Sequence, residues 1–261
     1  MLKLSQQITL VSSNMQNKKI ALVTGGNRGL GLGFVNVLMK KGYHVIATCR
    51  EPQKSNELAS LQSSGTALSL IDLDIADSES VGTLGENLRG LGIEQIDMLI
   101  NNAGINSKSA SSNDQASRFL AELDENVLLH MFDVNAVAPI LVTRALLPFL
   151  ANSSDPVIAF VSSQRASFND PEPSDKPNYG YAGSKVALNM FVKELAKELD
   201  SEADGKYRIF SVHPGSVETD MNQQGVMTPV ESAAKIVGFA ENFDLKNTGK
   251  FFNYDGNLFP L

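Results

Sequence analysis

The sequence has 261 residues, of which 43% are hydrophobic and 20% are charged, and its formal net charge is −7. This composition is typical of a globular protein with a sizeable core, and the negative charge argues against nucleic acid or a membrane surface as a partner. A single cysteine, Cys49, excludes an internal disulfide and favours a reducing, cytoplasmic setting, while three scattered histidines predict no metal site.

The amino-terminal segment, residues 1–18, is mostly polar. Its longest apolar run, ITLV at 8–11, is too short for the core of a signal peptide. No window of the chain approaches the roughly 20 apolar residues that cross a bilayer. We therefore expect residues 1–18 to form a flexible arm and residues 19–261 to form a single domain.

From residue 19 onward, apolar runs alternate with amphipathic stretches. The apolar runs are rich in Val, Ile and aromatic residues and predict strands buried on both faces: 19–24, 43–48, 67–72, 96–101, 156–162 and 207–212. The amphipathic stretches predict helices near 29–41, 53–64, 77–90, 114–150 (as two helices), 179–199 and 229–240. This alternation predicts an α/β fold, doubly wound, with a mostly parallel sheet flanked by helices on both faces.

The first predicted strand runs into a glycine-rich turn, TGGNRGLG at 24–31, which leads into the first predicted helix. Glycines let the backbone approach a pyrophosphate closely, and the pyrophosphate then lies at the helix N-terminus. A strand before the turn and a helix after it distinguish a dinucleotide site from an ordinary turn. The turn therefore predicts dinucleotide binding.

Further motifs follow the later strands. They are NNAG at 101–104, Asn135 in FDVNAVAP, Ser163 in FVSSQ, Tyr181 and Lys185 in YAGSK, and HPG at 213–215 with Thr219. Together with the T-G-x-x-x-G-x-G spacing of the turn, these motifs resemble, in order, those of the short-chain dehydrogenase/reductase family. The ending, GKFFNYDGNLFP, resembles the last strand and tail of C-factor and Sniffer-like carbonyl reductases. The resemblance covers the chain from about Lys19 to its end and implies a Rossmann-type sheet of seven strands.

Two tyrosines, Tyr179 and Tyr181, precede Lys185. Residues i and i+4 of a helix lie about 40° apart on one face, so Tyr181 can work beside Lys185 and Tyr179 cannot. A phenol with a pKa near 10 transfers protons poorly at neutral pH, and lowering that pKa by roughly three units requires about 4 kcal/mol. An ammonium group about 4 Å away, at an effective dielectric constant near 20, supplies about this much. We therefore expect Lys185 to acidify Tyr181.

The resemblance implies a catalytic role for each of four residues. Tyr181 gives a proton to the carbonyl oxygen, and Ser163 holds that oxygen by a hydrogen bond. Lys185 lowers the pKa of the tyrosine and binds the nicotinamide ribose, and Asn135 anchors a water that links Lys185 to solvent. Ser162 remains an alternative to Ser163. The spacing from Ser163 to Tyr181 is longer than the family usually has, and we attribute the extra residues to the Pro-rich patch at 169–178.

The resemblance also implies a set of cofactor-binding residues. They lie in the glycine turn, after the second, third and fourth strands, in the Tyr-Lys motif and after the sixth strand: Gly25, Asn27, Arg28, Gly29, Leu30, Gly31, Arg50, Asp74, Ile75, Asn102, Ala103, Gly104, Tyr181, Lys185, Pro214, Gly215, Val217 and Thr219.

The residues at the end of the second predicted strand indicate whether the cofactor is NADP or NAD. NAD-binding proteins of this fold place Asp or Glu there to bind the ribose 2′-hydroxyl, but this chain has Cys49 and Arg50. A second arginine, Arg28, lies inside the glycine turn, and guanidinium groups suit a dianionic 2′-phosphate. The neighbouring Glu51 should point away by register. We therefore predict NADP(H) in preference to NAD(H).

These observations predict an NADP-dependent oxidoreductase that transfers hydride between the cofactor and a small carbonyl or alcohol substrate. The alternative is a non-catalytic NADP-binding regulatory or signalling protein of the same fold. The substrate stays open, although Met221, Val226 and Met227 suggest a partly apolar lid or simple core packing, and Phe168 is a candidate lining residue. By the same resemblance, we expect a homodimer or homotetramer that pairs through the helices at 114–150 and 179–199.

Overall fold

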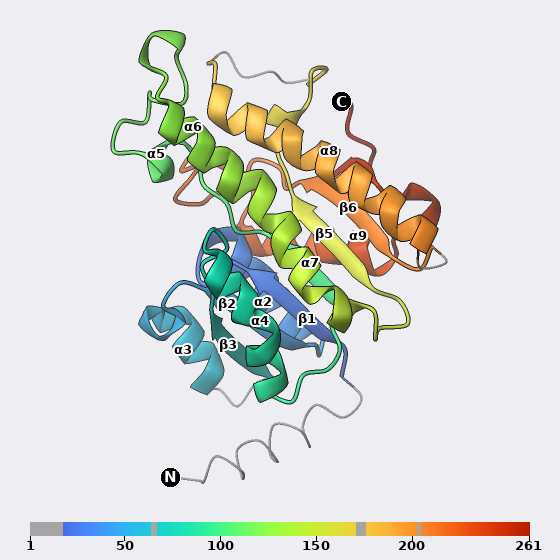
Figure 1. The fold of residues 1–261 in the computed structure, drawn as a ribbon. Helices are drawn as coiled ribbons and strands as arrows, with labels where there is room; N and C mark the ends of the chain where they lie inside the picture. Colours follow the sequence, from blue (N-terminus) through green and yellow to red (C-terminus); the bar gives the residue numbers. More distant parts are fainter. Residues whose placement is uncertain (1–17, 64–66, 171–175, 203–204) are drawn as a thin grey trace.

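A computed structural model describes residues 18–63, 67–170, 176–202 and 205–261 (Figure 1). The predicted arm at 1–18 lies outside the described residues except for Lys18, and so do residues 171–175 of the Pro-rich patch. The described residues form one sheet with helices on both of its faces (Figure 1).

The sheet has seven strands in the order β3-β2-β1-β4-β5-β6-β7, and every neighbouring pair is parallel. The strands are β1 (Ile20–Thr24), β2 (His44–Cys49), β3 (Leu68–Asp72), β4 (Met98–Asn101), β5 (Val157–Val161), β6 (Arg208–His213) and β7 (Lys250–Asn253). The predicted doubly wound Rossmann-type fold is thus confirmed, and the sheet is fully rather than mostly parallel.

Helices cover both faces of the sheet because successive side chains of a buried strand point to opposite sides. In β1, Ala21 and Val23 belong to a core shared with α2 (Gly29–Lys40) and α9 (Pro229–Glu241), whereas Ile20 and Leu22 belong to a core on the other face. The helices of that second face are α4 (Ser78–Gly90), α7 (Ala138–Leu150) and α8 (Tyr179–Glu202). The remaining helices are α3 (Asn56–Ser63), α5 (Ser107–Ala110) and α6 (Glu125–Phe132).

The long helical stretch differs from the expectation in where it begins and in how it is divided. The Asp124 side chain accepts a hydrogen bond from the Val127 amide at 3.0 Å, so α6 begins there rather than near residue 114. A π-helical segment, Asp133–Val137, then joins α6 to α7 without a break, where two separate helices were expected. The short helix α5 was not expected from the sequence.

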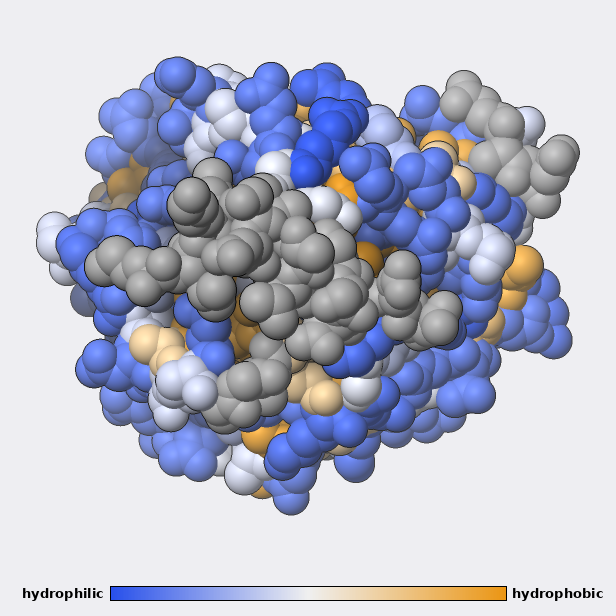
Figure 2. Space-filling model, turned by 90° about the horizontal axis from the view of Figure 1, so that it is seen from below, coloured by the Kyte–Doolittle hydropathy of each residue, from blue (hydrophilic) through white to orange (hydrophobic). Residues whose placement is uncertain are grey.

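The continuous helix Glu125–Leu150 is also long and apolar enough to cross a membrane by length and composition. The expectation that no stretch of the chain is apolar enough to cross a membrane is therefore wrong for this helix. However, 56% of its most apolar window is buried inside the fold, as expected for a helix that covers a sheet. The face of the molecule in Figure 2 is mostly hydrophilic outside the grey atoms, with small and separate hydrophobic spots.

Candidate active site

A cleft of about 1110 Å³ lies at the carboxyl ends of the strands. The sheet order runs outward in opposite directions from β1 and β4, and ligands of open parallel sheets bind beside such a switch point. Every predicted catalytic and cofactor-binding residue lines this cleft. Segments far apart in the sequence are thus brought to one place.

The glycine turn forms one wall of the cleft and leads into α2. Gly25 and Gly29 have φ angles of 66° and 51°, which side chains other than glycine rarely adopt. A Cβ atom on Gly31 would lie 2.0 Å from the Gly25 carbonyl oxygen, so the turn can close only on a glycine. The N-cap residue Arg28 makes no side-chain capping hydrogen bond. The first amides of α2 therefore face the cleft without a side-chain cap, which fits the phosphates of a dinucleotide.

The NNAG segment after β4 is fixed to this turn through Thr24. The amides of Asn102 and Ala103 both donate to the Thr24 hydroxyl at 3.0 Å, and the Asn102 side chain donates to the Thr24 carbonyl at 2.9 Å. A Cβ atom on Gly25 would lie 3.1 Å from the Ala103 Cα. The two segments thus form a single cradle of backbone with little room for side chains.

The two arginines expected to bind a 2′-phosphate both line the cleft, and each has an acidic partner. Arg28 Nη1 lies 2.7 Å from Asp220 Oδ2, and Arg50 Nη1 lies 3.9 Å from Asp74 Oδ2. All four side chains are substantially exposed, so these ion pairs hold the arginines only weakly. A dianionic ligand could therefore compete with the carboxylates for both guanidinium groups.

Glu51 also borders the cleft, and the expectation that its side chain points away from a 2′-phosphate stays a prediction. The register argument assumed an extended chain, but β2 ends at Cys49 and Glu51 has a φ of 51°. Its carboxylate is paired with Lys54. The mouth of the cleft therefore carries an acid as well as two arginines.

The opposite end of the cleft contains Tyr181 and Lys185 on the first turns of α8. Lys185 Nζ lies 5.9 Å from the centroid of the Tyr181 ring. Tyr179 is 49% exposed and does not line the cleft. Asn178 accepts a hydrogen bond from the Tyr181 amide at 3.1 Å and so fixes the start of the helix. Of the two tyrosines, the structure brings only Tyr181 together with the lysine, as the spacing predicted.

The electrostatics of Tyr181 differ from the expectation. Burial raises the pKa of the phenol, and a hydrogen bond from the Ser163 side chain and the charge of Arg165 oppose this rise only in part. Lys185 Nζ instead donates to the Val161 carbonyl at 2.8 Å, and burial lowers the pKa of Lys185 to about 8. The predicted acidification of Tyr181 by Lys185 is therefore absent here, because desolvation dominates for both groups.

The geometry favours Ser163 over Ser162 as the catalytic serine. The hydroxyl of Ser163 accepts a hydrogen bond from the Arg165 amide at 3.2 Å and also contacts the Tyr181 phenol. The hydroxyl of Ser162 is buried and has no hydrogen-bond partner among the described residues. Both serines line the cleft, but Ser163 is the one coupled to the tyrosine.

Asn135 is fully buried and lies in the π-helical segment. Its amide oxygen accepts from the Ile105 amide at 2.8 Å, and its amide nitrogen donates to the Ile105 carbonyl at 2.9 Å and to the Ser184 hydroxyl at 3.1 Å. A Cβ atom on Gly104 would lie only 3.0 Å from the amide oxygen of Asn135. The extra residue of a π-bulge is a common feature of functional sites, and here it accompanies a side chain that clamps the loop after β4.

The residues proposed for an apolar lid are divided by the structure. Met221 lines the cleft, whereas Val226 is 88% exposed and Met227 does not line the cleft. Phe168 is 86% exposed and does not line it either, so that expectation is wrong.

Sequence reasoning missed several polar lining residues near Tyr181. They are Asn106, Ser109, His130, Gln164, Arg165 and Asn178. Arg165 had a detectable signal, since it is a charged residue two positions after the candidate serine at the end of a buried strand. Within the described ranges, no group of three or more His, Cys, Asp or Glu side chains is placed to hold a metal ion.

Comparison with known proteins agrees with this geometry. The family model described as short chain dehydrogenase matches residues 19–228. An uncharacterized oxidoreductase of Schizosaccharomyces pombe is 29% identical over 262 residues, which cover 93% of this chain and 98% of the relative.

Two solved structures share the fold. The NADPH-bound carbonyl reductase from chicken fatty liver is 28% identical with a TM-score of 0.81, over 94% of this chain and 99% of that one. The carbonyl reductase Sniffer of Drosophila melanogaster is 28% identical with a TM-score of 0.82 over the same shares. The chain is therefore an oxidoreductase that belongs to the short-chain dehydrogenase family.

Proposed function

We propose that the protein is an NADP(H)-dependent carbonyl reductase or, in the reverse direction, an alcohol dehydrogenase. The observation that carries this proposal is that one cleft contains the glycine turn and the coupled Ser163 and Tyr181 side chains. The glycine turn would hold the phosphates of a cofactor, and Tyr181 in the same cleft would supply a proton to a substrate. The NADPH of the chicken carbonyl reductase supports the choice of cofactor.

The cofactor supplies a hydride to the carbonyl carbon when it is bound. The amides of the glycine turn suit its phosphates, Arg28 and Arg50 suit a 2′-phosphate, and Lys185 suits the ribose hydroxyls. Asp74 and Ile75 would hold the adenine. The loops after β4 and β6, which include Asn102, Ala103, Gly104, Pro214, Gly215, Val217 and Thr219, would enclose the rest.

The chain's own residues would manage the proton. Negative charge builds on the carbonyl oxygen during reduction, and the Tyr181 hydroxyl gives its proton to that oxygen while Ser163 holds the oxygen by a hydrogen bond. The raised pKa of Tyr181 fits a phenol that carries its proton before the reaction and can donate it. The lowered pKa of Lys185 suits it to pass a proton onward, with Asn135 as the predicted anchor of a connecting water.

A preference for NADP(H) is supported by Arg28 and Arg50 at the cleft mouth, although Glu51 lies there as well. Steady-state kinetics with both cofactors would test this preference. We expect a lower KM for NADPH than for NADH, and a preference for NADH with both arginines intact would contradict the proposal.

We also propose a homodimer or homotetramer. Exposed apolar side chains lie on α6 and α8, which pack against each other: Leu129, Phe132, Met190 and Phe191. Light scattering would test this assembly, and a monomeric mass would reject it.

A cytoplasmic location remains a prediction, supported by a single buried cysteine, Cys49.

A turnover screen tests the main proposal. Aldehydes, ketones and quinones would be offered with NADPH to the wild type and to Tyr181→Phe. We expect consumption of NADPH by the wild type that depends on Tyr181. Tight NADPH binding without any Tyr181-dependent turnover would instead favour a regulatory or signalling protein.

A further inference from the structure

Polar side chains line the cleft that contains Tyr181. They include Asn106, Ser109, His130, Gln164, Arg165 and Asn178, which carry amide, hydroxyl, imidazole or guanidinium groups. Apolar lining residues of the same cleft include Ile105, Val134 and Val161. A substrate with a polar or charged group would find hydrogen-bond partners in this lining, so the cleft suits a small polar substrate.

Besides Lys185, Arg165 is a cationic side chain that lines the cleft close to the residues of the proposed chemistry. It belongs to a 3-10 turn, Gln164–Ala166, that follows Ser163 directly and packs against α8. Its amide donates to the Ser163 hydroxyl at 3.2 Å, and its Nη1 donates to the Lys176 carbonyl at 2.8 Å. The residue is thus held at both its backbone and its guanidinium end. Its charge reaches the Tyr181 hydroxyl, whose pKa it lowers.

The charges around Arg165 are mixed. Arg118 and burial lower the pKa of the Arg165 guanidinium, whereas Asp170 and Tyr181 raise it. Arg118 itself pairs with Asp114 at 3.2 Å. A guanidinium has five N–H donors in a planar fork, so it can serve a backbone carbonyl, a nearby carboxylate and a bound anion at once. Asp170 is then a competitor that tunes anion binding.

We propose that the substrate is a small oxo acid, with its carboxylate one or two bonds from the carbonyl carbon, and that Arg165 binds this carboxylate. The inference rests on the proposed function. The short separation follows from the position of Arg165, whose amide donates at 3.2 Å to the hydroxyl of Ser163, the residue proposed to hold the carbonyl oxygen. In the reaction, the carbonyl carbon gains hydride, its oxygen gains the Tyr181 proton, and the carboxylate is unchanged.

Matched pairs of substrates test this inference. Initial rates with NADPH would be measured for 2-oxobutanoate and its methyl ester, and for 3-oxobutanoate and its methyl ester. For the wild type we expect kcat/KM to favour each acid over its ester by about tenfold or more. In Arg165→Gln the acid should lose about 10- to 100-fold more than the ester, which is the worth of a hydrogen bond to a charged group. Arg165→Lys should retain part of the preference.

Two further variants keep the test informative. Arg89→Gln removes an exposed arginine on α4 that does not line the cleft, and should leave both substrates unchanged. Asp170→Asn should increase the preference for the acid, because a competing carboxylate is lost. NADPH fluorescence would show that each variant is folded and binds the cofactor.

The outcomes separate this inference from the proposed function. Wild-type reduction of neutral aldehydes or esters, with no preference for the acids, would overturn the inference alone. An equal loss on acid and ester in Arg165→Gln would also overturn it, since Arg165 would then act only on Tyr181. Absence of any NADPH-dependent turnover would instead contradict the proposed function.

Discussion

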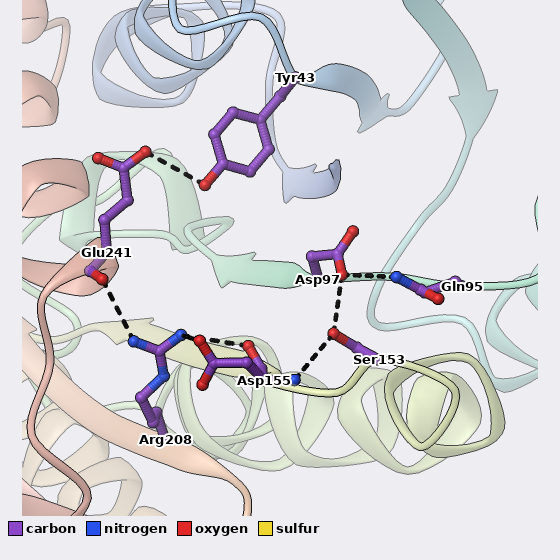
Figure 3. A network of polar contacts seen from close by, with 7 residues as sticks. All are labelled: Tyr43, Gln95, Asp97, Ser153, Asp155, Arg208 and Glu241. Atoms are coloured by element: carbon purple, nitrogen blue, oxygen red, sulfur yellow. Dashed lines mark hydrogen bonds and ion pairs between the residues drawn. The ribbon is translucent and has the colours of Figure 1, made fainter. Parts of the chain in front are cut away.

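The two edges of the sheet use similar polar residues in opposite ways. At the edge formed by the amino ends of the strands, charged side chains have partners within the chain (Figure 3). Asp97 accepts hydrogen bonds from the Ile20 amide at 2.8 Å and from Gln95 and Ser153 at 2.7 Å each. Arg208 contacts Asp155 and donates to the Glu241 carbonyl at 3.3 Å.

At the carboxyl edge, several polar groups are buried with few partners. Lys185 is buried with a hydrogen bond to a backbone carbonyl rather than to an acid. Ser162 Oγ and His213 Nδ1 are buried and have no hydrogen-bond partner among the described residues. Such groups cost stability unless a ligand satisfies them. The comparison indicates that one edge is built for stability and the other for binding and chemistry.

The largest expected effect is a loss of activity, without a loss of stability, from a substitution at the carboxyl edge. Tyr181→Phe removes the proton donor while leaving the ring in place, so kcat should fall by about 10²- to 10⁴-fold. The free energy of unfolding should change by less than about 1 kcal/mol, because the ring still fills its site. Tyr179→Phe is the matched control and should keep its activity. A Tyr181→Phe enzyme with near wild-type kcat would remove the tyrosine from the mechanism.

The next effect concerns the buried charge of Lys185. Its pKa is lowered from 10.5 to about 8 by burial, so the folded state is penalised wherever the amine is charged in the unfolded state. The penalty is absent above about pH 10.5, grows as the pH falls, and is complete below about pH 8, where it amounts to about 3 kcal/mol.

Denaturant unfolding at several pH values would measure this penalty against Lys185→Met. The unfolding free energy of the wild type should rise by about 3 kcal/mol relative to the variant between about pH 8 and pH 10.5. A difference between the two proteins that does not change with pH would contradict a buried, charge-penalised lysine.

At the amino edge, a substitution should lower the stability of the protein and leave its activity unchanged. Asp97→Ala removes a carboxylate that accepts from a backbone amide and two side chains, so the protein should lose about 2 kcal/mol of unfolding free energy. Turnover per folded molecule should stay unchanged, because the residue lies at the far edge from the cleft. Chemical denaturation and initial rates measure the two quantities, and a specific loss of kcat would break the comparison.

The smallest expected effect is at the cofactor end. Asp220→Asn removes the carboxylate paired with Arg28, and exposed pairs of this kind are worth about 0.2–1 kcal/mol. NADPH should then bind up to about fivefold more tightly, with little change for NADH. Titration calorimetry with both cofactors would measure this. Equal tightening for the two would mean that Arg28 does not contact the 2′-phosphate.

Much of the fold could be predicted because buried strands and glycine turns have local signals. The six predicted strands agree with the structure to within two residues at each end, since runs such as that of β1 are apolar throughout. The start of α6 was predicted too early, because the apolar pattern around residue 114 does not reveal the cap at Asp124. The π-helical segment has no known sequence period and was missed for that reason.

The residues that form the candidate site could be predicted from the sequence, but the directions of their pKa shifts could not. Motif order placed Ser163, Tyr181 and Lys185 in one cleft, as the structure has them. The direction of the Tyr181 pKa depends on burial and on where the Lys185 ammonium points, and neither can be read from a four-residue spacing. Arg165 was missed although it lies two positions after Ser163, because that spacing does not show that its charge acts on Tyr181.

The most direct test of the central claim is the transfer of label from a deuterated cofactor. A carbonyl substrate from the screen would be incubated with NADPH that carries deuterium at the transferable position, and the alcohol product would be analysed by mass spectrometry. We predict one deuterium per molecule of product from the wild type and no detectable product from Tyr181→Phe over the same time. Tight binding of the cofactor, with no deuterium in any product from the wild type, would contradict the account.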